Sequence, residues 1–212
     1  MTDVLIPGED GEPTEHLRQR YFDSLNAQAY GGNIQDYIDK TTKLQGVEGV
    51  KVYPVWNGGG TVKLVIINSL FQPPSQILID EVQTAADPVQ NQGLGLGFAP
   101  IGHVVTVEGV QMQSIDVKLN LTYETGWNWA AVEPFVKEVI DEYFTDLASE
   151  WHKVGWIDDP AATLIVRISQ LEVRLLSVAG IVDIADTMLD GDTQNIVLGI
   201  DSIPVRGVVS DG

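Results

Sequence analysis

The chain has 212 residues, 44% of them hydrophobic, so it is long enough to bury a full core and is not a disordered or fibrous protein. Its 30 acidic and 12 basic side chains give a net charge of −18, which disfavours binding to the nucleic-acid backbone and to anionic membranes. The sequence contains no cysteine, which excludes disulfides, thiolate zinc sites and cysteine nucleophiles.

The N-terminal part is expected to be a short lead-in followed by a helix. Residues 1–11 have neither a basic start nor an apolar run, so we expect no signal peptide there. A helix is predicted from Thr14, a good N-cap residue, because Leu17, Tyr21 and Leu25 recur on one helical face. No apolar stretch of the chain approaches the ~18 residues of a membrane span.

The next part of the sequence alternates between helical and strand patterns. Asn33 is expected to cap a second helix, and the glycine-rich segment 57–60 is typical of the turn of a β-hairpin. The expected elements, in chain order, are this helix, hairpin strands at 50–53 and 61–65, a helix that starts near Ser75 and a strand at 103–107.

The second half contains the two clearest patterns. Residues 115–122 alternate apolar and polar side chains, which predicts a half-buried strand. Residues 132–147 repeat apolar side chains every three or four positions, which predicts an amphipathic helix. A loop at 151–160, a helix at 164–175 and three short strands within 181–209 are expected to follow.

A short internal repeat in the sequence suggests two similar halves. Val47-Glu48-Gly49-Val50 and Val178-Ala179-Gly180-Ile181 each follow a predicted helix and precede a predicted hairpin. We therefore expect an α+β fold of two small subdomains, each with helices packed on a short, mostly antiparallel sheet. The expected division is a lead-in and helix at 1–30, a first subdomain at 31–109 and a second at 110–212.

No segment carries a recognisable catalytic, cofactor or metal motif. The histidines His16, His103 and His152 do not have the spacing of a metal site, and we expect none to act as a ligand. Asp190-Gly191-Asp192 lacks the ligand spacing of a calcium loop and is typical of a turn. The glycines of segment 93–97 precede a predicted strand, so the dinucleotide-binding fingerprint fails. We expect no catalytic residues, no cofactor, no metal and no small-molecule substrate.

Tryptophans bracket the predicted helix 132–147 and form the candidate interaction site. Trp127 and Trp129 precede this helix, and Trp151 and Trp156 follow it; the candidate interface residues are Trp127, Trp129 and Trp156. Packing of the helix ends is one interpretation, and a contact with another protein is the other, because tryptophan is enriched in binding hot spots.

Three segments together resemble one protein family. They are residues 8–20 (GEDGEPTEHLRQR), residues 29–33 (AYGGN) and residues 50–62 (VKVYPVWNGGGTV). In this order they are similar to the baseplate J-like proteins of contractile-tailed bacteriophages and prophages. Residues 178–181 and 203–207 are similar to the carboxyl end of that family.

The resemblance implies a structural component of the tail baseplate, in the wedge ring around the central hub, which acts by protein–protein assembly. It implies other baseplate proteins as partners, self-contacts as a further option, and a place in the virion after assembly in the host cytoplasm. It implies neither nucleic-acid nor membrane binding. Two alternatives stay open: a cell-wall hydrolase, and a carbohydrate- or receptor-binding module in which Trp127, Trp129 and Trp156 are stacking platforms.

Overall fold

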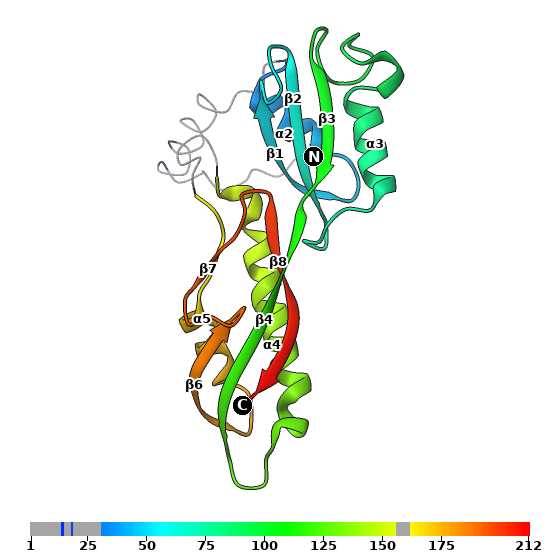
Figure 1. The fold of residues 1–212 in the computed structure, drawn as a ribbon. Helices are drawn as coiled ribbons and strands as arrows, with labels where there is room; N and C mark the ends of the chain where they lie inside the picture. The colour runs from blue at the N-terminus through cyan, green and yellow to red at the C-terminus, as the bar shows by residue number, and fades with distance from the viewer. Residues whose placement is uncertain (1–13, 15–17, 19–30, 156–161) are drawn as a thin grey trace, which may run out of the picture.

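The computed structural model describes Thr14, Arg18 and residues 31–155 and 162–212. The helix expected from Thr14 therefore lies, apart from Thr14 and Arg18, outside the described residues, as does Trp156. The described chain forms two three-stranded sheets, each covered by helices and stacked end to end along one long axis, and one small two-stranded sheet beside the second of them (Figure 1). This arrangement confirms the expected α+β class.

The first sheet has three strands in the order β1-β2-β3. β1 and β2 pair as the expected antiparallel hairpin, and β2 pairs with β3 in parallel through a crossover that contains a helix. Asn33 accepts a hydrogen bond from the backbone N–H of Asp36 and so caps the first helix as expected. The elements are α2 (Ile34–Thr41), β1 (Val47–Pro54), β2 (Thr61–Asn68), α3 (Gln76–Ala86), the 3₁₀ turn η1 (Val89–Asn91) and β3 (Val104–Gly109).

The outer edge of β3 is covered by side chains. The buried carboxylate of Asp87 accepts the N–H groups of Gly93 and Val105, and the Gln83 amide oxygen accepts the N–H of Val107. These bonds satisfy backbone donors that an edge strand would otherwise leave open to another chain. This edge of the sheet is therefore closed to strand addition.

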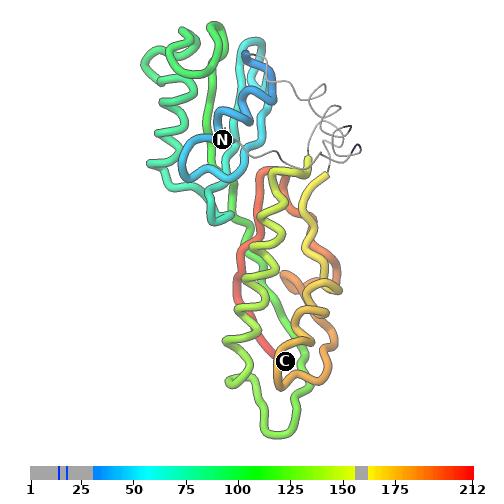
Figure 2. The backbone as a smooth tube through the Cα atoms, turned by 180° about the vertical axis from the view of Figure 1, so that it is seen from behind, coloured from blue at the N-terminus to red at the C-terminus, as the bar shows by residue number. Residues whose placement is uncertain are grey.

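The second sheet is built around one long central strand. β4 pairs with β6 in antiparallel fashion and with β8 in parallel, and α4 and α5 cover one face of the sheet (Figures 1 and 2). The elements are β4 (Gln111–Tyr123), α4 (Trp129–Ser149), the 3₁₀ turn η2 (Trp151–Lys153), β5 (Ile165–Val166), α5 (Ile168–Leu175), β6 (Ile181–Leu189), β7 (Ile196–Val197) and β8 (Ser202–Asp211).

Two expectations for this half are wrong. The internal repeat predicted a second hairpin, formed by the strand after residue 178 and the segment around 195–200. Instead β7 pairs with β5, while β6 and β8 lie on either side of β4. The predicted helix 164–175 begins at Ile168, because residues 165 and 166 form β5. Its thirteen residues make β4 long enough to hold both of its partners.

The core is divided into two clusters that meet on β2. The side chains of Leu64 and Ile66 are in the cluster beneath α2 and α3. The side chains of Val65 and Ile67 point to the opposite face and are in the cluster of the second half, with β4 and α4. Because strand side chains alternate between faces, one strand contributes to both cores. The two halves therefore share buried apolar surface.

Candidate interaction surfaces

The structure places two of the three candidate tryptophans at the end of the molecule that is remote from the first sheet. Trp127 lies in the turn between β4 and α4, and its indole ring packs on Gly180. Gly180 has a φ of +92°, and a Cβ atom there would lie 2.3 Å from the ring, so the site requires glycine. Trp127 is 37% exposed, whereas Trp129, the first residue of α4, is half-buried against the core. Trp156 lies outside the described residues.

A fourth tryptophan, Trp151, has a structural role whose partners the sequence did not indicate. Trp151 was assigned to a loop, but it is fully buried in η2. Its indole N–H donates to the carbonyl oxygen of Ile200 at 3.0 Å, and the ammonium of Lys51 lies 4.6 Å from the ring centroid. The Lys51 ammonium donates to the same carbonyl at 2.7 Å. Trp151 therefore joins strand β1 of the first sheet to the β7–β8 loop of the second half.

Asp201, the next residue in that loop, completes this junction. One carboxylate oxygen accepts the hydroxyl of Tyr53 at 2.5 Å, and the other lies 3.3 Å from the ammonium of Lys63. The backbone carbonyl of Asp201 accepts the N–H of Gln111 at 2.8 Å. Burial raises the pKa of the Tyr53 phenol, and the hydrogen bond to Asp201 adds to this. We call Lys51, Tyr53, Lys63, Trp151 and Asp201 the junction.

The junction could be recognised from the sequence only in part. Lys51 and Tyr53 are two residues apart on a strand, so they share one face, opposite to the apolar Val50 and Val52. That pattern predicts a polar face. It does not predict that a loop about 150 residues later covers this face and leaves Lys51 only 3% exposed.

The burial of Lys51 leads to a prediction about pH. Burial lowers the pKa of its ammonium to about 8 from the ordinary 10.5, because the charged form is poorly solvated, while the Asp201 charge acts in the opposite direction. Between these two values the unfolded chain binds more protons than the folded one. The contribution of Lys51 to stability therefore rises with pH in this window.

The measurement is the free energy of unfolding of the wild type minus that of Lys51→Met at a series of pH values. We expect this difference to rise by about 2 kcal/mol between about pH 7.5 and about pH 9.5. Lys118→Met, at an exposed position of β4, is the control and should show no such rise. A flat difference for Lys51→Met would contradict the burial of its charge.

A groove lies at the boundary between the two halves. It has a volume of about 640 Å³, and its wall includes Phe71 from the first half and Met112 and Ile203 from the second. At its rim, Arg206 donates to both carboxylate oxygens of Asp141, at 2.7 and 3.0 Å. These two charged groups neutralise each other in a bidentate pair. The lining therefore does not offer the unpaired acid and base that hydrolysis of a glycosidic bond needs.

The part of the chain that the structure describes contains neither a metal-binding cluster nor a helix suited to span a membrane. No cluster of three or more histidine or carboxylate side chains there is placed to bind a metal ion. His103 accepts or donates a hydrogen bond with the hydroxyl of Tyr37 at 2.8 Å, and His152 packs beside Gly49. None of the described helices is both long and apolar enough to cross a bilayer.

Comparison with known families matches almost the whole described chain. The family model of the baseplate J-like central domain matches residues 29–109, and that of the baseplate J-like C-terminal domain matches residues 115–210.

Two curated relatives from Bacillus subtilis strain 168 match along the chain. The protein YqbT is 32% identical over 210 residues, and the phage-like element PBSX protein XkdT is 31% identical over 209 residues. Each alignment covers 99% of this chain and 56% of the relative, so the chain spans about half the length of these proteins. The baseplate protein gp47 of Escherichia phage Mu is 27% identical over 124 residues, which are 56% of this chain and 34% of gp47.

A solved structure shares the fold. A chain in the cryo-EM structure of the anti-feeding prophage baseplate, determined with six-fold symmetry, aligns with a TM-score of 0.55 and 10% identity. The alignment covers 92% of this chain and 42% of that one.

Proposed function

The chain belongs to the baseplate J-like protein family, and we propose on this basis that it is a structural component of a contractile-tail baseplate. The observation that carries the proposal is the match of both family domains, which together cover most of the chain. The names of two relatives support it, because XkdT is a protein of a phage-like element and gp47 is a baseplate protein. We place this chain in the wedge ring, with other baseplate proteins as its partners.

The geometry supports a role in assembly over a role in catalysis. Charged side chains at the junction and at the groove rim are used in contacts within the chain. Such contacts fix the two halves relative to each other, which suits a rigid building block. We therefore propose that the protein has no enzymatic activity, that it is located in the virion baseplate and that it reaches this place from the host cytoplasm.

We also propose that residues 31–109 and 110–212 are the two structural units, with Gly109 and Val110 at their boundary. The first sheet ends with β3 at Gly109, and the long strand of the second sheet starts at Gln111. The carbohydrate-binding alternative needs exposed stacking rings. Trp127 supports it poorly, because its ring packs on Gly180 and is covered there.

A pull-down from a lysate of tail-producing cells tests the proposed function. The purified chain should recover other baseplate proteins, because residues 110–212 carry 17 acidic and 6 basic side chains and suit a basic neighbour. The yield should fall as NaCl is raised from about 0.1 M to about 1 M, since salt screens such contacts. If no baseplate protein is recovered and the chain releases fragments from purified peptidoglycan, the hydrolase alternative replaces this proposal.

A further inference from the structure

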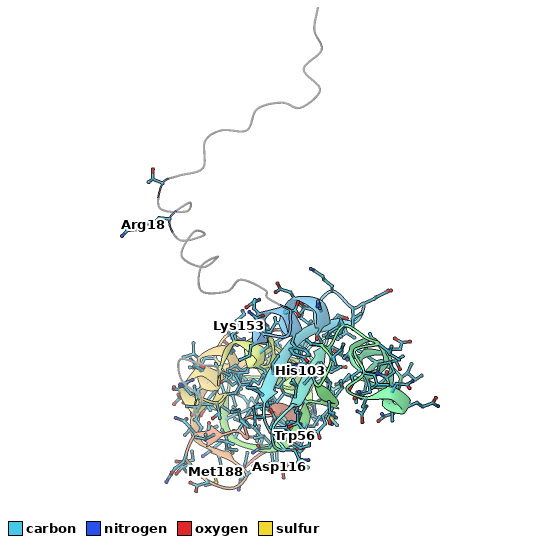
Figure 3. All side chains as sticks on the ribbon, turned by 90° about the horizontal axis from the view of Figure 1, so that it is seen from above. Arg18, Trp56, His103, Asp116, Lys153 and Met188 are labelled. Atoms are coloured by element: carbon cyan, nitrogen blue, oxygen red, sulfur yellow. The ribbon has the colours of Figure 1, made fainter. Side chains whose placement is uncertain are left out.

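A histidine of the second half packs on the backbone of the first half. His152 belongs to η2, and its ring lies against Gly49 of β1. A Cβ atom at Gly49 would lie 2.7 Å from the ring atom Cγ and 2.9 Å from Nδ1, so a side chain at this position would displace the ring. Figure 1 shows the end of α4, which leads into η2, below the first sheet, and Figure 3 labels the neighbouring Lys153 in the view from above. We call the packing of His152 on Gly49 the His152 contact.

One nitrogen of this ring has no partner. Nδ1 of His152 is buried and makes no hydrogen bond to any described residue. A buried polar atom without a partner destabilises the folded state, whereas the ring of a phenylalanine would pack on the glycine without that cost. Packing alone therefore does not account for a histidine at this position.

The two charge states of the ring differ in what they leave unpaired. In the neutral ring one nitrogen carries no hydrogen, and when Nδ1 is that nitrogen the contact buries no unpaired donor. In the protonated ring both nitrogens carry hydrogen, so Nδ1 becomes a buried N–H donor without an acceptor and the ring becomes a partly buried cation. The neutral ring therefore suits the His152 contact, and the protonated ring does not.

The surrounding charges do not reverse this preference. Burial lowers the pKa of the His152 imidazole, and the ammonium groups of Lys153 and Lys51 act in the same direction. The carboxylates of Glu150 and Glu48 act in the opposite direction and are outweighed. Lys51 is already a buried cation of the junction, so protonation of His152 adds a second cation near it.

We propose that the His152 contact is an acid-sensitive element, which holds η2 against β1 while the ring is neutral and releases η2 when the ring is protonated. The folded chain binds this proton less tightly than the unfolded chain does, so the contact is fully formed above the ordinary histidine value of 6.5 and is lost as the pH falls below it. The apolar surface that the halves share on β2 carries no charge, and we expect it to keep the halves attached. Mild acid should therefore loosen the junction without unfolding the chain.

The indole N–H of Trp151 reports on this opening. Trp151 precedes His152 in η2, is fully buried and donates to the carbonyl of Ile200, so its hydrogen exchanges with solvent only when η2 moves away. The measurement is this exchange rate, by NMR on the whole chain, relative to that of N-acetyltryptophanamide at the same pH. We expect the protection to fall at least ~3-fold between about pH 7.5 and about pH 5. The lower value stays above the sequence pI near 4.2, and ordinary carboxylates remain ionised there.

Variants of the histidine separate its titration from other effects of acid. His152→Phe keeps an aromatic ring on Gly49 but cannot be protonated, so its protection should not change over this pH range. His152→Gln, which is smaller and also uncharged, should give the same flat response if the phenylalanine does not fit. The matched control is His103→Gln, because His103 hydrogen-bonds to Tyr37 within the first half, and it should keep the wild-type response.

Four results would overturn the inference. They are a wild-type protection that does not change with pH, a fall of the same size in His152→Phe, an equal fall at the backbone N–H of Ile140 in the core of α4, and an NMR titration of the His152 ring with a midpoint at or above that of histidine in an unstructured peptide. The third would mean that acid unfolds the whole chain. The inference goes beyond the proposed function and is tested on the purified chain alone, so its failure leaves assembly into a baseplate untouched.

Discussion

Replacing Ile140 with Asp is expected to lower the free energy of unfolding by about 4 kcal/mol or more. Ile140 is fully buried in the middle of α4, in the core cluster of the second half. The variant loses a buried aliphatic side chain and gains a carboxylate that is poorly solvated. The core cluster around Ile140 is hydrophobic, so the folded state takes the desolvation cost of the carboxylate.

Urea unfolding of the wild type and the variant, monitored by circular dichroism, measures this loss. Phe135→Asp is the matched control on the same helix, because Phe135 is 52% exposed and should lose far less. Equal effects of the two substitutions would contradict the assignment of the buried face of α4.

Replacing Trp151 with Ala is expected to cost about 3–5 kcal/mol and to loosen the two halves relative to each other. The ring is fully buried, donates to the carbonyl of Ile200 and lies beneath the ammonium of Lys51. Its removal leaves a cavity at the junction, beside the buried ammonium of Lys51. Both the packing and one of the two hydrogen bonds to Ile200 are lost.

Two measurements on Trp151→Ala separate stability from arrangement. Urea unfolding gives the free energy, and small-angle X-ray scattering gives the radius of gyration, which should rise if the halves move apart. The variant Trp151→Phe keeps an aromatic ring but has no indole N–H, so it should lie between the wild type and Trp151→Ala in both measurements. A stable Trp151→Ala variant with unchanged scattering would mean that contacts other than those of Trp151 hold the two halves together.

Elements with a long and regular pattern could be predicted from the sequence. Strand β4 and helix α4 were expected because their apolar residues repeat over eight and sixteen positions. The hairpin β1–β2 was expected because the glycines between its strands permit the positive φ values of a tight turn, such as +96° at Gly58. The signals for these elements are local, so no knowledge of the rest of the fold was needed.

Features that depend on distant contacts were missed. The pattern of α4 assigned Phe135 to the apolar face, but it lies at the margin of that face and is half exposed. From the internal repeat in the sequence, the second half was expected to contain a hairpin like that of the first. In the structure, β6 and β8 instead both pair with the central strand β4. The short strand β5 has two residues and exists because β7 pairs with it.

The candidate interaction site stays a prediction, because the sequence could narrow it only to a residue type. Composition identifies tryptophan as a good contact residue, but it does not say which tryptophan the fold covers. Trp151 is buried at the junction, while Trp127 is partly covered by Gly180.

We propose that the protein works by being built into a baseplate. The most direct test is immunogold electron microscopy of purified tails from cells that express the protein with an epitope tag. We expect gold at the baseplate end of the tail, and this label should remain after washing in buffers that remove loosely bound protein. Tails without gold, with the tagged protein confined to the unassembled fraction of the same cells, would contradict it.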